Sequence, residues 1–362
     1  MRTLHIDTER GWRGGEQQAL YLCGGLLQHG HEAVMACRRG DEMARRAARA
    51  GVPTYQFNPT GEIDPGAMLR LARLIRTGCF DLVHMHTSHA HTLGTLAGML
   101  SPETALIVSR RVDFSVRKHA GSILKYKLPI DRYIAISEAV RDVLVDDGIS
   151  ADRISVVHSG IDLSRFEHVE ERDLHGEFGL PDDVVVIGNL GALVDHKGHR
   201  YLLDAAPRVL DHYPEARFII CGEGELREPL EEQRRRLGLE GHVLLPGFRS
   251  DVPELLDFFD IYAVPSHMEG LNTSLLDALA MRNPVAACAA GGIPEIVRDD
   301  ETGLLVPPRD PERLADAIIE LIENPERGRE MGRAGRQLVE REFSVESMVS
   351  GTLEVYRRVL EE

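Results

Sequence analysis

Short apolar runs alternate with amphipathic segments along almost the whole chain. The front half contains seven such runs, which we expect to be strands, at residues 4–7, 33–36, 54–57, 82–85, 105–108, 133–136 and 154–157. Segments with helical spacing lie between several of them, at 16–29, 65–77 and 137–146, and the last begins with Ser137 in the position of a helix cap. This alternation indicates parallel βαβ units rather than an antiparallel meander.

The alternation stops in a polar, charge-rich stretch at 167–183 and then begins again. The expected strands of the back half lie at 184–190, 217–221, 243–245, 261–264, 285–287 and 303–306. Pro311 fits the first turn of a helix, and 325–360 is typical of a helix with a break near Phe343 and Ser344.

We therefore predict an α/β protein built from two Rossmann-like, doubly wound parallel-sheet domains. The N-terminal domain is expected at 1–178 and the C-terminal domain at 179–342, with a C-terminal helix at 343–362 that can return to the N-terminal domain. Open α/β sheets bind ligands beyond the carboxyl ends of their strands. Two such domains facing one another would form a deep cleft whose helix N-termini suit anionic ligands.

Composition narrows the class of protein. The 362 residues are 43% apolar, which is enough for two ordinary cores. No apolar run approaches the roughly 18 residues of a spanning helix, and the first residues lack the apolar core of a signal peptide. The five cysteines are scattered and odd in number, so we expect a reduced, cytoplasmic location. The formal charge of −16 argues against a nucleic-acid partner.

Positive charge is concentrated in the stretch 109–132. We expect its cations to bind an anionic acceptor or to touch an anionic membrane at the inner face of the cell membrane: Arg110, Arg111, Arg117, Lys118, Lys125 and Lys127. Nearby Ile, Leu and Tyr side chains give the mixture that an interfacial helix uses. The alternative is a solvated cationic face. Only four lysines occur in the chain, and Lys197 stands alone in the back half.

The segment from Pro265 to Ala280 combines carboxylates with a helix start. Glu269 and Asp277 would lie about 12 Å apart if the segment were helical throughout. The amides of 270–272 would then sit at a helix N-terminus, where phosphate oxygens are stabilised. The alternative is a capped amphipathic helix with solvated carboxylates.

This segment, continued through Val285 to the run Gly-Gly-Ile-Pro-Glu that ends at Glu295, resembles the retaining, GT-B-fold glycosyltransferases of family 4, the group 1 glycosyltransferases. The resemblance extends over nearly the whole chain. It departs from the family at Asp277, where a second Glu is usual, at Asn272, where Pro is usual, and at 282–283, near the usual Gly.

The resemblance implies roles for residues of the back half. Glu269 would hold sugar hydroxyls, Asp277 the ribose and Lys197 the diphosphate, while Ala192 replaces an arginine of the family, so helix N-termini or Arg249 must supply more of the positive charge. The other donor-binding candidates are Gly222, Gly224, Gly270, Leu271, Asn272, Gly291, Gly292 and Glu295. Each glycine also has the simpler explanation of a turn.

The front half contributes further candidates. The resemblance places the loop with Gly14, Gly15 and Glu16 over the donor phosphates; its spacing is not that of a dinucleotide-binding loop. Histidines at 84, 86, 89 and 91 suggest zinc, but neither cysteines nor a carboxylate cluster accompany them. The resemblance instead places His86 at the reaction centre, bonded to the transferring sugar. No Asp-x-Asp occurs, so we expect no metal and no cofactor.

We therefore expect a retaining hexosyltransferase that moves a sugar from a nucleoside diphosphate sugar to a hydroxyl of a glycolipid, lipopolysaccharide or polysaccharide-precursor acceptor, with Glu269, His86 and Lys197 as its catalytic residues. Domain closure would exclude water. Two alternatives stay open: an epimerase of related fold that acts on such sugars, and a non-catalytic sugar-nucleotide-binding protein. Sugar transfer, epimer formation, or donor binding without turnover would distinguish the three.

Overall fold

The computed structural model, which describes residues 1–115 and 125–362, divides the chain into two compact units. Unit 1 consists of Met1–Gly160 and Val345–Glu362, and unit 2 consists of Ile161–Ser344. The first boundary therefore lies earlier than the expected 178. The segment after Ile161 belongs to unit 2 because the Ile161 amide bonds to the Phe343 carbonyl at 2.9 Å and because Phe178 packs near Phe258.

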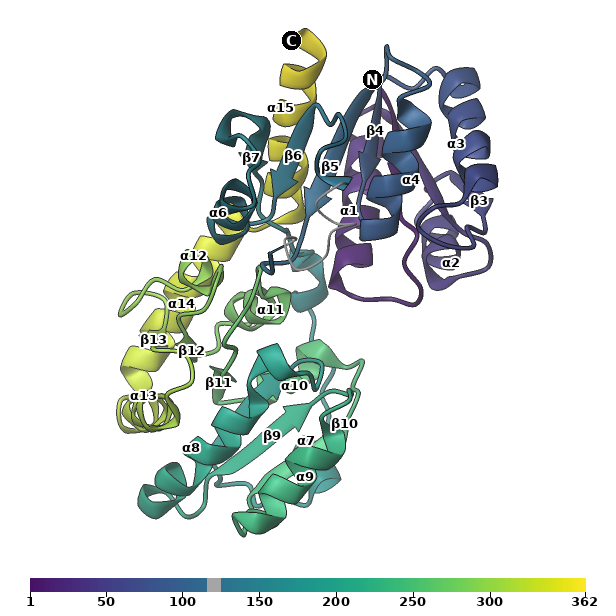
Figure 1. Ribbon diagram of the computed structural model, residues 1–362. Coiled ribbons are helices and arrows are strands. Elements are labelled where there is room, and N and C mark those ends of the chain that lie inside the picture. The colour runs from purple at the N-terminus through teal and green to yellow at the C-terminus, as the bar shows by residue number, and fades with distance from the viewer. Residues whose placement is uncertain (116–124) are drawn as a thin grey trace. The chain divides into compact units, whose positions relative to one another are not determined.

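Unit 1 is built on a seven-stranded parallel sheet in the order β3-β2-β1-β4-β5-β6-β7. Its strands are β1 (Arg2–Ile6), β2 (Glu32–Arg38), β3 (Thr54–Phe57), β4 (Leu82–Met85), β5 (Ala105–Arg110), β6 (Arg132–Ala135) and β7 (Ile154–Val156). Its described α-helices are α1 (Gly14–Gln28), α2 (Glu42–Arg49), α3 (Pro65–Gly78), α4 (Ser88–Gly98), α6 (Glu138–Asp146) and α15 (Val345–Glu361). Helices α3 and α4 pack beside one another on the sheet (Figure 1).

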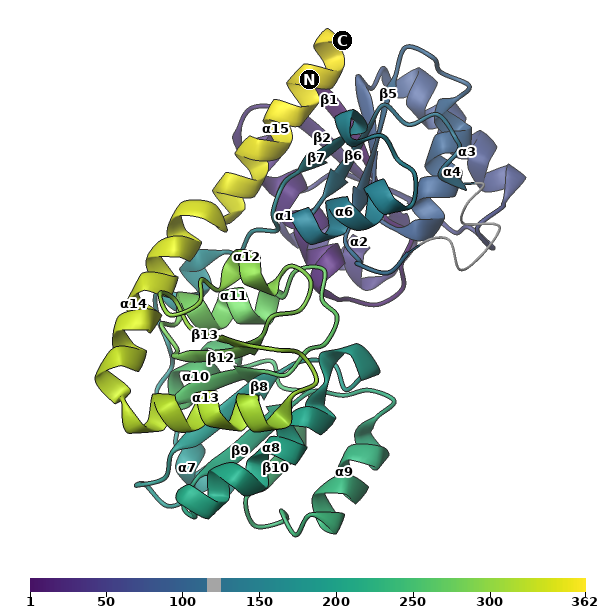
Figure 2. The ribbon, with the colours of Figure 1, turned by 60° about the vertical axis from the view of Figure 1, so that its left-hand side comes forward.

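The C-terminal helix α15 completes the core of unit 1 by packing against α1, as Figure 2 shows. A Cβ atom added to Gly25 of α1 would come within 2.4 Å of the Val349 side chain, so the absence of a side chain lets the two helices approach closely. Tyr356 of α15 is fully buried, and its hydroxyl lies 2.6 Å from Nδ1 of His84 on β4. The end of the chain is thus part of the first unit.

Unit 2 repeats the architecture with a six-stranded parallel sheet in the order β10-β9-β8-β11-β12-β13. Its strands are β8 (Val186–Leu190), β9 (Arg217–Cys221), β10 (Val243–Gly247), β11 (Ile261–Val264), β12 (Val285–Cys288) and β13 (Leu304–Val306). Its helices are α7 (Leu174–Phe178), α8 (His199–His212), α9 (Arg227–Arg236), α10 (Val252–Phe258), α11 (Thr273–Ala280), α12 (Ile293–Ile296), α13 (Pro311–Glu323) and α14 (Pro325–Glu342). Helices α8 and α13 pack together over its core.

The structure confirms every expected strand in both sheets, with bounds that differ by a few residues. Ser137 caps α6 by accepting the Val140 amide at 3.1 Å, Pro311 begins α13, and the chain breaks after Phe343 between α14 and α15. No helix among the described residues has the length and apolar content needed to cross a bilayer.

Both sheets have a switch point, where successive strands change the direction in which the sheet grows. In unit 1 it lies between β1 and β4, and in unit 2 it lies between β8 and β11. Ligands of open α/β sheets bind at the carboxyl ends of such strand pairs. These two places therefore contain the candidate sites.

Candidate functional site

In unit 2, the loops that follow β8 and β11 bring two predicted residues into direct contact. The ammonium Nζ of Lys197, in the loop after β8, lies 2.6 Å from Oε2 of Glu269, in the loop after β11. Glu269 is 8% exposed, so its charge needs this partner. The sequence placed both residues at the site but did not anticipate that they pair with one another.

Two further side chains bind the same carboxylate oxygen. Ser266 Oγ lies 3.4 Å and Asn272 Nδ2 lies 3.3 Å from Glu269 Oε2. Sequence reasoning missed Ser266, although a hydroxyl directly after a strand at a switch point is a usable signal. All three contacts involve Oε2, so Oε1 retains its lone pairs with respect to the described residues.

The helix that follows Glu269 begins later than the uniform helix we considered. Asn272 is the cap of α11, because its Oδ1 accepts the Leu275 amide at 3.0 Å, and the helix begins at Thr273. Glu269 thus lies in the loop, and the first helical amides belong to 273–274 rather than to 270–272. Asn272, where the family usually has Pro, both caps the helix and holds Glu269.

Asp277 lies on α11 with 13% of its side chain exposed and faces Arg165 at 3.5 Å between Oδ1 and Nη1. Burial raises the pKa of Asp277 to about 6, and the nearby Arg165 opposes this rise. Its Oδ1 has no hydrogen-bond partner among the described residues. Arg165 carries no signal in the sequence, since it comes from a segment far away along the chain.

The glycines of the predicted donor loops let backbones approach closely. A Cβ atom on Gly222 would lie 1.8 Å from the Gly191 carbonyl oxygen, and one on Gly224 would lie 2.4 Å from that of Leu193. The Gly292 amide donates to the Glu269 carbonyl at 2.9 Å. Gly270 and Leu271 are buried, whereas Gly291 is exposed and Glu295 is half-buried in the first turn of α12.

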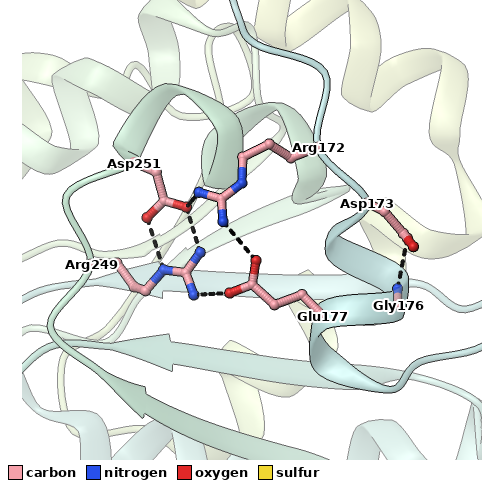
Figure 3. Close-up of polar contacts among 6 residues, drawn as sticks. All are labelled: Arg172, Asp173, Gly176, Glu177, Arg249 and Asp251. Carbon is pink, nitrogen blue, oxygen red and sulfur yellow. Dashed lines mark hydrogen bonds and ion pairs between the residues drawn. The ribbon is translucent and has the colours of Figure 1, made fainter.

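Arg249 takes part in a closed ring of two arginines and two carboxylates (Figure 3). Its Nε donates to Asp251 at 2.8 Å and its Nη1 to Glu177, while Arg172 bonds to the same two carboxylates at 2.5 and 2.8 Å. These carboxylates raise the pKa of Arg249. Donor binding by Arg249 stays a prediction.

In unit 1, Gly14, Gly15 and Glu16 form the first turn of α1, as the sequence indicated. Glu16 is buried and accepts the Arg13 amide at 2.8 Å. Gly15 and Glu16 line a cavity of about 440 Å³, together with His86, His91, Arg110, Arg111 and others. The helix start thus faces a cavity large enough for a sugar.

His86 lies beside two other buried histidines. Ring nitrogens of His5, His84 and His86 all lie within 4.8 Å of one another, a spacing compatible with a metal ion. Burial lowers the pKa of all three, that of His5 to about 3. His84 uses both nitrogens, toward Tyr356 and toward Ser109 at 2.8 Å. Sequence reasoning missed His5, because one histidine in a strand is no signal. Of the other two histidines considered for zinc, His89 is exposed and His91 is buried.

The basic stretch divides into cations with different environments. Lys125 does not face solvent or a membrane: its side chain is 7% exposed and its Nζ bonds to Glu62 at 2.9 Å and to Ser88 Oγ at 2.7 Å. Arg110 bonds to the Tyr126 hydroxyl and to two carbonyls of its own loop. Lys127 is exposed. Arg117 and Lys118 lie outside the described residues.

Arg111 is half-buried and Asp7 is buried, and neither forms an ion pair with another described residue, although Asp7 accepts the Glu9 amide at 3.0 Å. Burial lowers the pKa of Arg111 to about 10, and its Nε has no hydrogen-bond partner among the described residues. Asp7 follows β1 and is 1% exposed; burial and the nearby Glu16 raise its pKa to about 7. Sequence reasoning missed Asp7, although a carboxylate at the end of the first strand could have indicated a site.

Comparisons with known proteins point to one family. A family model described as "Glycosyltransferase Family 4" matches residues 12–165, and one described as "Glycosyl transferases group 1" matches residues 170–338. The chain is 27% identical over 302 residues to "Putative glycosyltransferase EpsD" of Bacillus subtilis, covering 79% of each chain. It is 25% identical over 287 residues to the Escherichia coli "UDP-Gal:alpha-D-GlcNAc-diphosphoundecaprenol alpha-1,3-galactosyltransferase", covering 75% of this chain and 74% of that one.

The fold is shared with solved structures. The crystal structure of Anabaena Alr3699/HepE in complex with UDP and glucose superposes with a TM-score of 0.86 at 21% identity, covering 99% of this chain and 100% of that one. This likeness confirms the predicted GT-B architecture of two Rossmann-like domains. Since the two family models together span most of both units, the chain belongs to the group 1 glycosyltransferases of glycosyltransferase family 4.

Proposed function

We propose that this glycosyltransferase transfers a hexose from a nucleoside diphosphate sugar to a hydroxyl of a glycolipid, lipopolysaccharide or polysaccharide-precursor acceptor, with retention of the anomeric configuration. Unit 2 binds the donor and unit 1 binds the acceptor. The name of the Escherichia coli relative supports a UDP-sugar donor and a lipid-linked acceptor. The UDP and glucose bound to the Anabaena protein support a nucleotide-sugar site in this fold.

The contact between Lys197 and Glu269 carries the proposal. A buried carboxylate with Oε2 held by three donors is fixed in orientation, and its Oε1 can accept hydroxyl hydrogen bonds from a sugar. The adjacent ammonium supplies positive charge for the leaving diphosphate. Ala192 is exposed and brings no charge, so the role of Lys197 is correspondingly larger.

The reaction needs no enzymic nucleophile. The bond between the anomeric carbon and the β-phosphate oxygen breaks, and the acceptor hydroxyl attacks on the same face. Its proton passes to the departing phosphate oxygen, so charge and atoms balance without a metal or cofactor. Lys197 and the first amides of α11 stabilise the negative charge that develops on the diphosphate, and Asp277 binds the ribose.

Acceptor binding is supported by the cavity of unit 1. Arg110 and Arg111 are half-buried cations of its lining, and Arg111 has no ion-pair partner among the described residues. An anionic acceptor would supply the missing partner. The exposed Lys127 lies close along the chain and provides contact with an anionic membrane surface.

The test is a transfer assay with purified protein, UDP- and GDP-sugars and a panel of lipid-linked acceptors, with the product anomer assigned by NMR. We expect Lys197→Ala to lower kcat about tenfold or more, because the leaving group loses its cation. Arg200→Ala is the matched control, since Arg200 is an exposed cation of α8 that pairs with Asp195. Near-normal rates for Lys197→Ala, or donor consumed only by epimerisation, would contradict the proposal.

A further inference from the structure

One nitrogen of the buried His86 ring has no hydrogen-bond partner among the residues that the structure describes. The side chain lines the cavity of unit 1 and is 5% exposed. Its Nε2 lies 3.0 Å from Nδ1 of His5, whereas its Nδ1 has no hydrogen-bond partner among the described residues. A buried polar atom that stays unbonded is costly. Nδ1 is therefore the nitrogen of His86 that remains for a ligand.

The positions of the protons on His5 and His86 follow from the hydrogen bonds of Thr3, which contacts His5. Thr3 has one hydroxyl proton, which it donates to the Glu32 carbonyl at 3.1 Å. Its oxygen can then only accept from Nε2 of His5, 3.0 Å away. Nε2 of His5 therefore carries a proton.

Because the rings of His5 and His86 are both neutral, the positions of their remaining protons follow. Burial holds the pKa of His5 at about 3 and that of His86 well below the usual value, so each ring carries a single N–H at neutral pH. Since Nε2 of His5 is protonated, its Nδ1 must accept, and the donor must be Nε2–H of His86. Nδ1 of His86 is thus left as a lone pair.

We propose that Thr3 and His5 are positioning residues that hold His86 in the Nε2–H tautomer, so that its Nδ1 accepts a hydrogen bond from a hydroxyl of the saccharide in the unit 1 cavity. The identity of the ligand as a saccharide rests on the proposed function, whereas the assignment of the Nε2–H tautomer of His86 does not. The hydrogen bond at one ring nitrogen of a histidine determines whether the other nitrogen carries a proton. Thr3 and His5 therefore determine whether Nδ1 of His86 accepts or donates, although neither of them touches the sugar.

His84 does not compete for His86. Its ring lies 4.1 Å from that of His86 between centroids, but its two nitrogens are held by Tyr356 and Ser109. A metal bound by the three histidines would need one bond of His84 and one bond of His5 to be broken, because both nitrogens of each ring are engaged. The hydrogen-bond chain and a metal site are therefore mutually exclusive arrangements of the same rings.

Tautomers can be observed by long-range ¹H–¹⁵N correlation NMR on the full-length protein with ¹⁵N-labelled histidine. We expect His86 to be protonated at Nε2 alone. His5→Leu should produce a mixture of tautomers, whereas His5→Gln should preserve the Nε2–H form, because its carboxamide oxygen can accept in place of Nδ1. A proton on Nδ1 of wild-type His86, or histidine resonances that titrate stoichiometrically with added Zn²⁺, would overturn the proposal.

Kinetics test the ligand half separately. We expect His5→Leu to lower kcat about tenfold and His5→Gln to restore most of it. Thr3→Val and Thr3→Ser form a second, matched pair should His5→Leu not fold, and the hydroxyl-bearing variant should retain the rate. A changed tautomer with an unchanged rate would overturn the role of Nδ1. A wild-type protein that transfers no sugar would refute the proposed function and leave the tautomer assignment standing.

Discussion

The two units share one sheet topology, but the switch point of unit 2 holds a pair of charged side chains and that of unit 1 holds uncharged histidines. At the switch point of unit 2, the loops after β8 and β11 hold a cation and an anion, Lys197 and Glu269, 2.6 Å apart. At the switch point of unit 1, β1 and β4 carry His5 and His84 opposite one another, and His86 follows β4 directly. Burial keeps these imidazoles uncharged.

The difference shows how a buried polar site can satisfy its charge. Unit 2 supplies a partner, and unit 1 uses groups that lose their charge on burial. Three carboxylates with little exposed surface form a graded series on this principle. Asp7 lacks an ion-pair partner among the described residues, Asp277 faces Arg165 at 3.5 Å, and Glu269 contacts Lys197 at 2.6 Å.

Asp7→Asn should have the largest effect on stability. The pKa of Asp7 rises from 3.8 to about 7 on folding, so the carboxyl is neutral in the folded state below that pH. Stability from this group is full below the unfolded pKa and is lost as the pH rises through the folded pKa, a loss of up to about 4 kcal/mol. Chemical denaturation should therefore show Asp7→Asn to be more stable than wild type at pH 8.

The same comparison at pH 5 is the control for Asp7→Asn, since most of the advantage should vanish where the folded carboxyl keeps its proton. A stability advantage of equal size at both values of pH would mean that the ionised form of Asp7 bears no burial penalty. Asp7 would then no longer support the contrast between the two units.

Asp277→Asn should act in the same direction with a smaller effect, because Arg165 offsets part of the burial. With a folded pKa of about 6, the loss of stability as the pH rises is up to about 3 kcal/mol, and it is complete by about pH 7. Denaturation curves at pH 5 and pH 8 measure it. The exposed Asp257 provides the control variant, Asp257→Asn, which should be neutral. If Asp277→Asn stabilised more than Asp7→Asn, the proposed grading would be reversed.

Glu269→Ala should leave the protein folded and reduce kcat/KM for transfer by about 100-fold, equivalent to about 2.7 kcal/mol, because the proposed site would lose the carboxylate that positions the sugar. Steady-state assays with the preferred donor measure the reduction. Glu330→Ala removes an exposed carboxylate of α14 and should have no effect. A variant of Glu269 within threefold of the wild-type rate would show that pairing with Lys197 serves structure alone.

Local patterns in the sequence predicted the fold well, but they did not predict the contacts between distant segments. The buried strands are continuous apolar runs, so each was found, and Ser137 and Pro311 marked helix starts through their own chemistry. The start of α11 was misplaced because the capping role of Asn272 was not recognised, although Asn is a common cap.

The parts of the sites that were missed depend on tertiary placement. Lys125 looked like a surface cation, and only the fold shows that Glu62 and Ser88 enclose it. His5 and Asp7 belong to a site because β1 lies next to β4, a neighbour relation that no local pattern contains. Glu269 and Lys197 were found by resemblance to a family, whereas their pairing is a matter of geometry.

The return of α15 to unit 1 sets the order in which the protein can mature. The side chains of Val349 and Tyr356 pack against Gly25 and His84, which come from much earlier in the chain. During synthesis, unit 1 must therefore wait until α15 has been translated before its core closes. A premature stop codon after Ser344 would spare every residue of unit 2 and yet remove α15 from the core of unit 1.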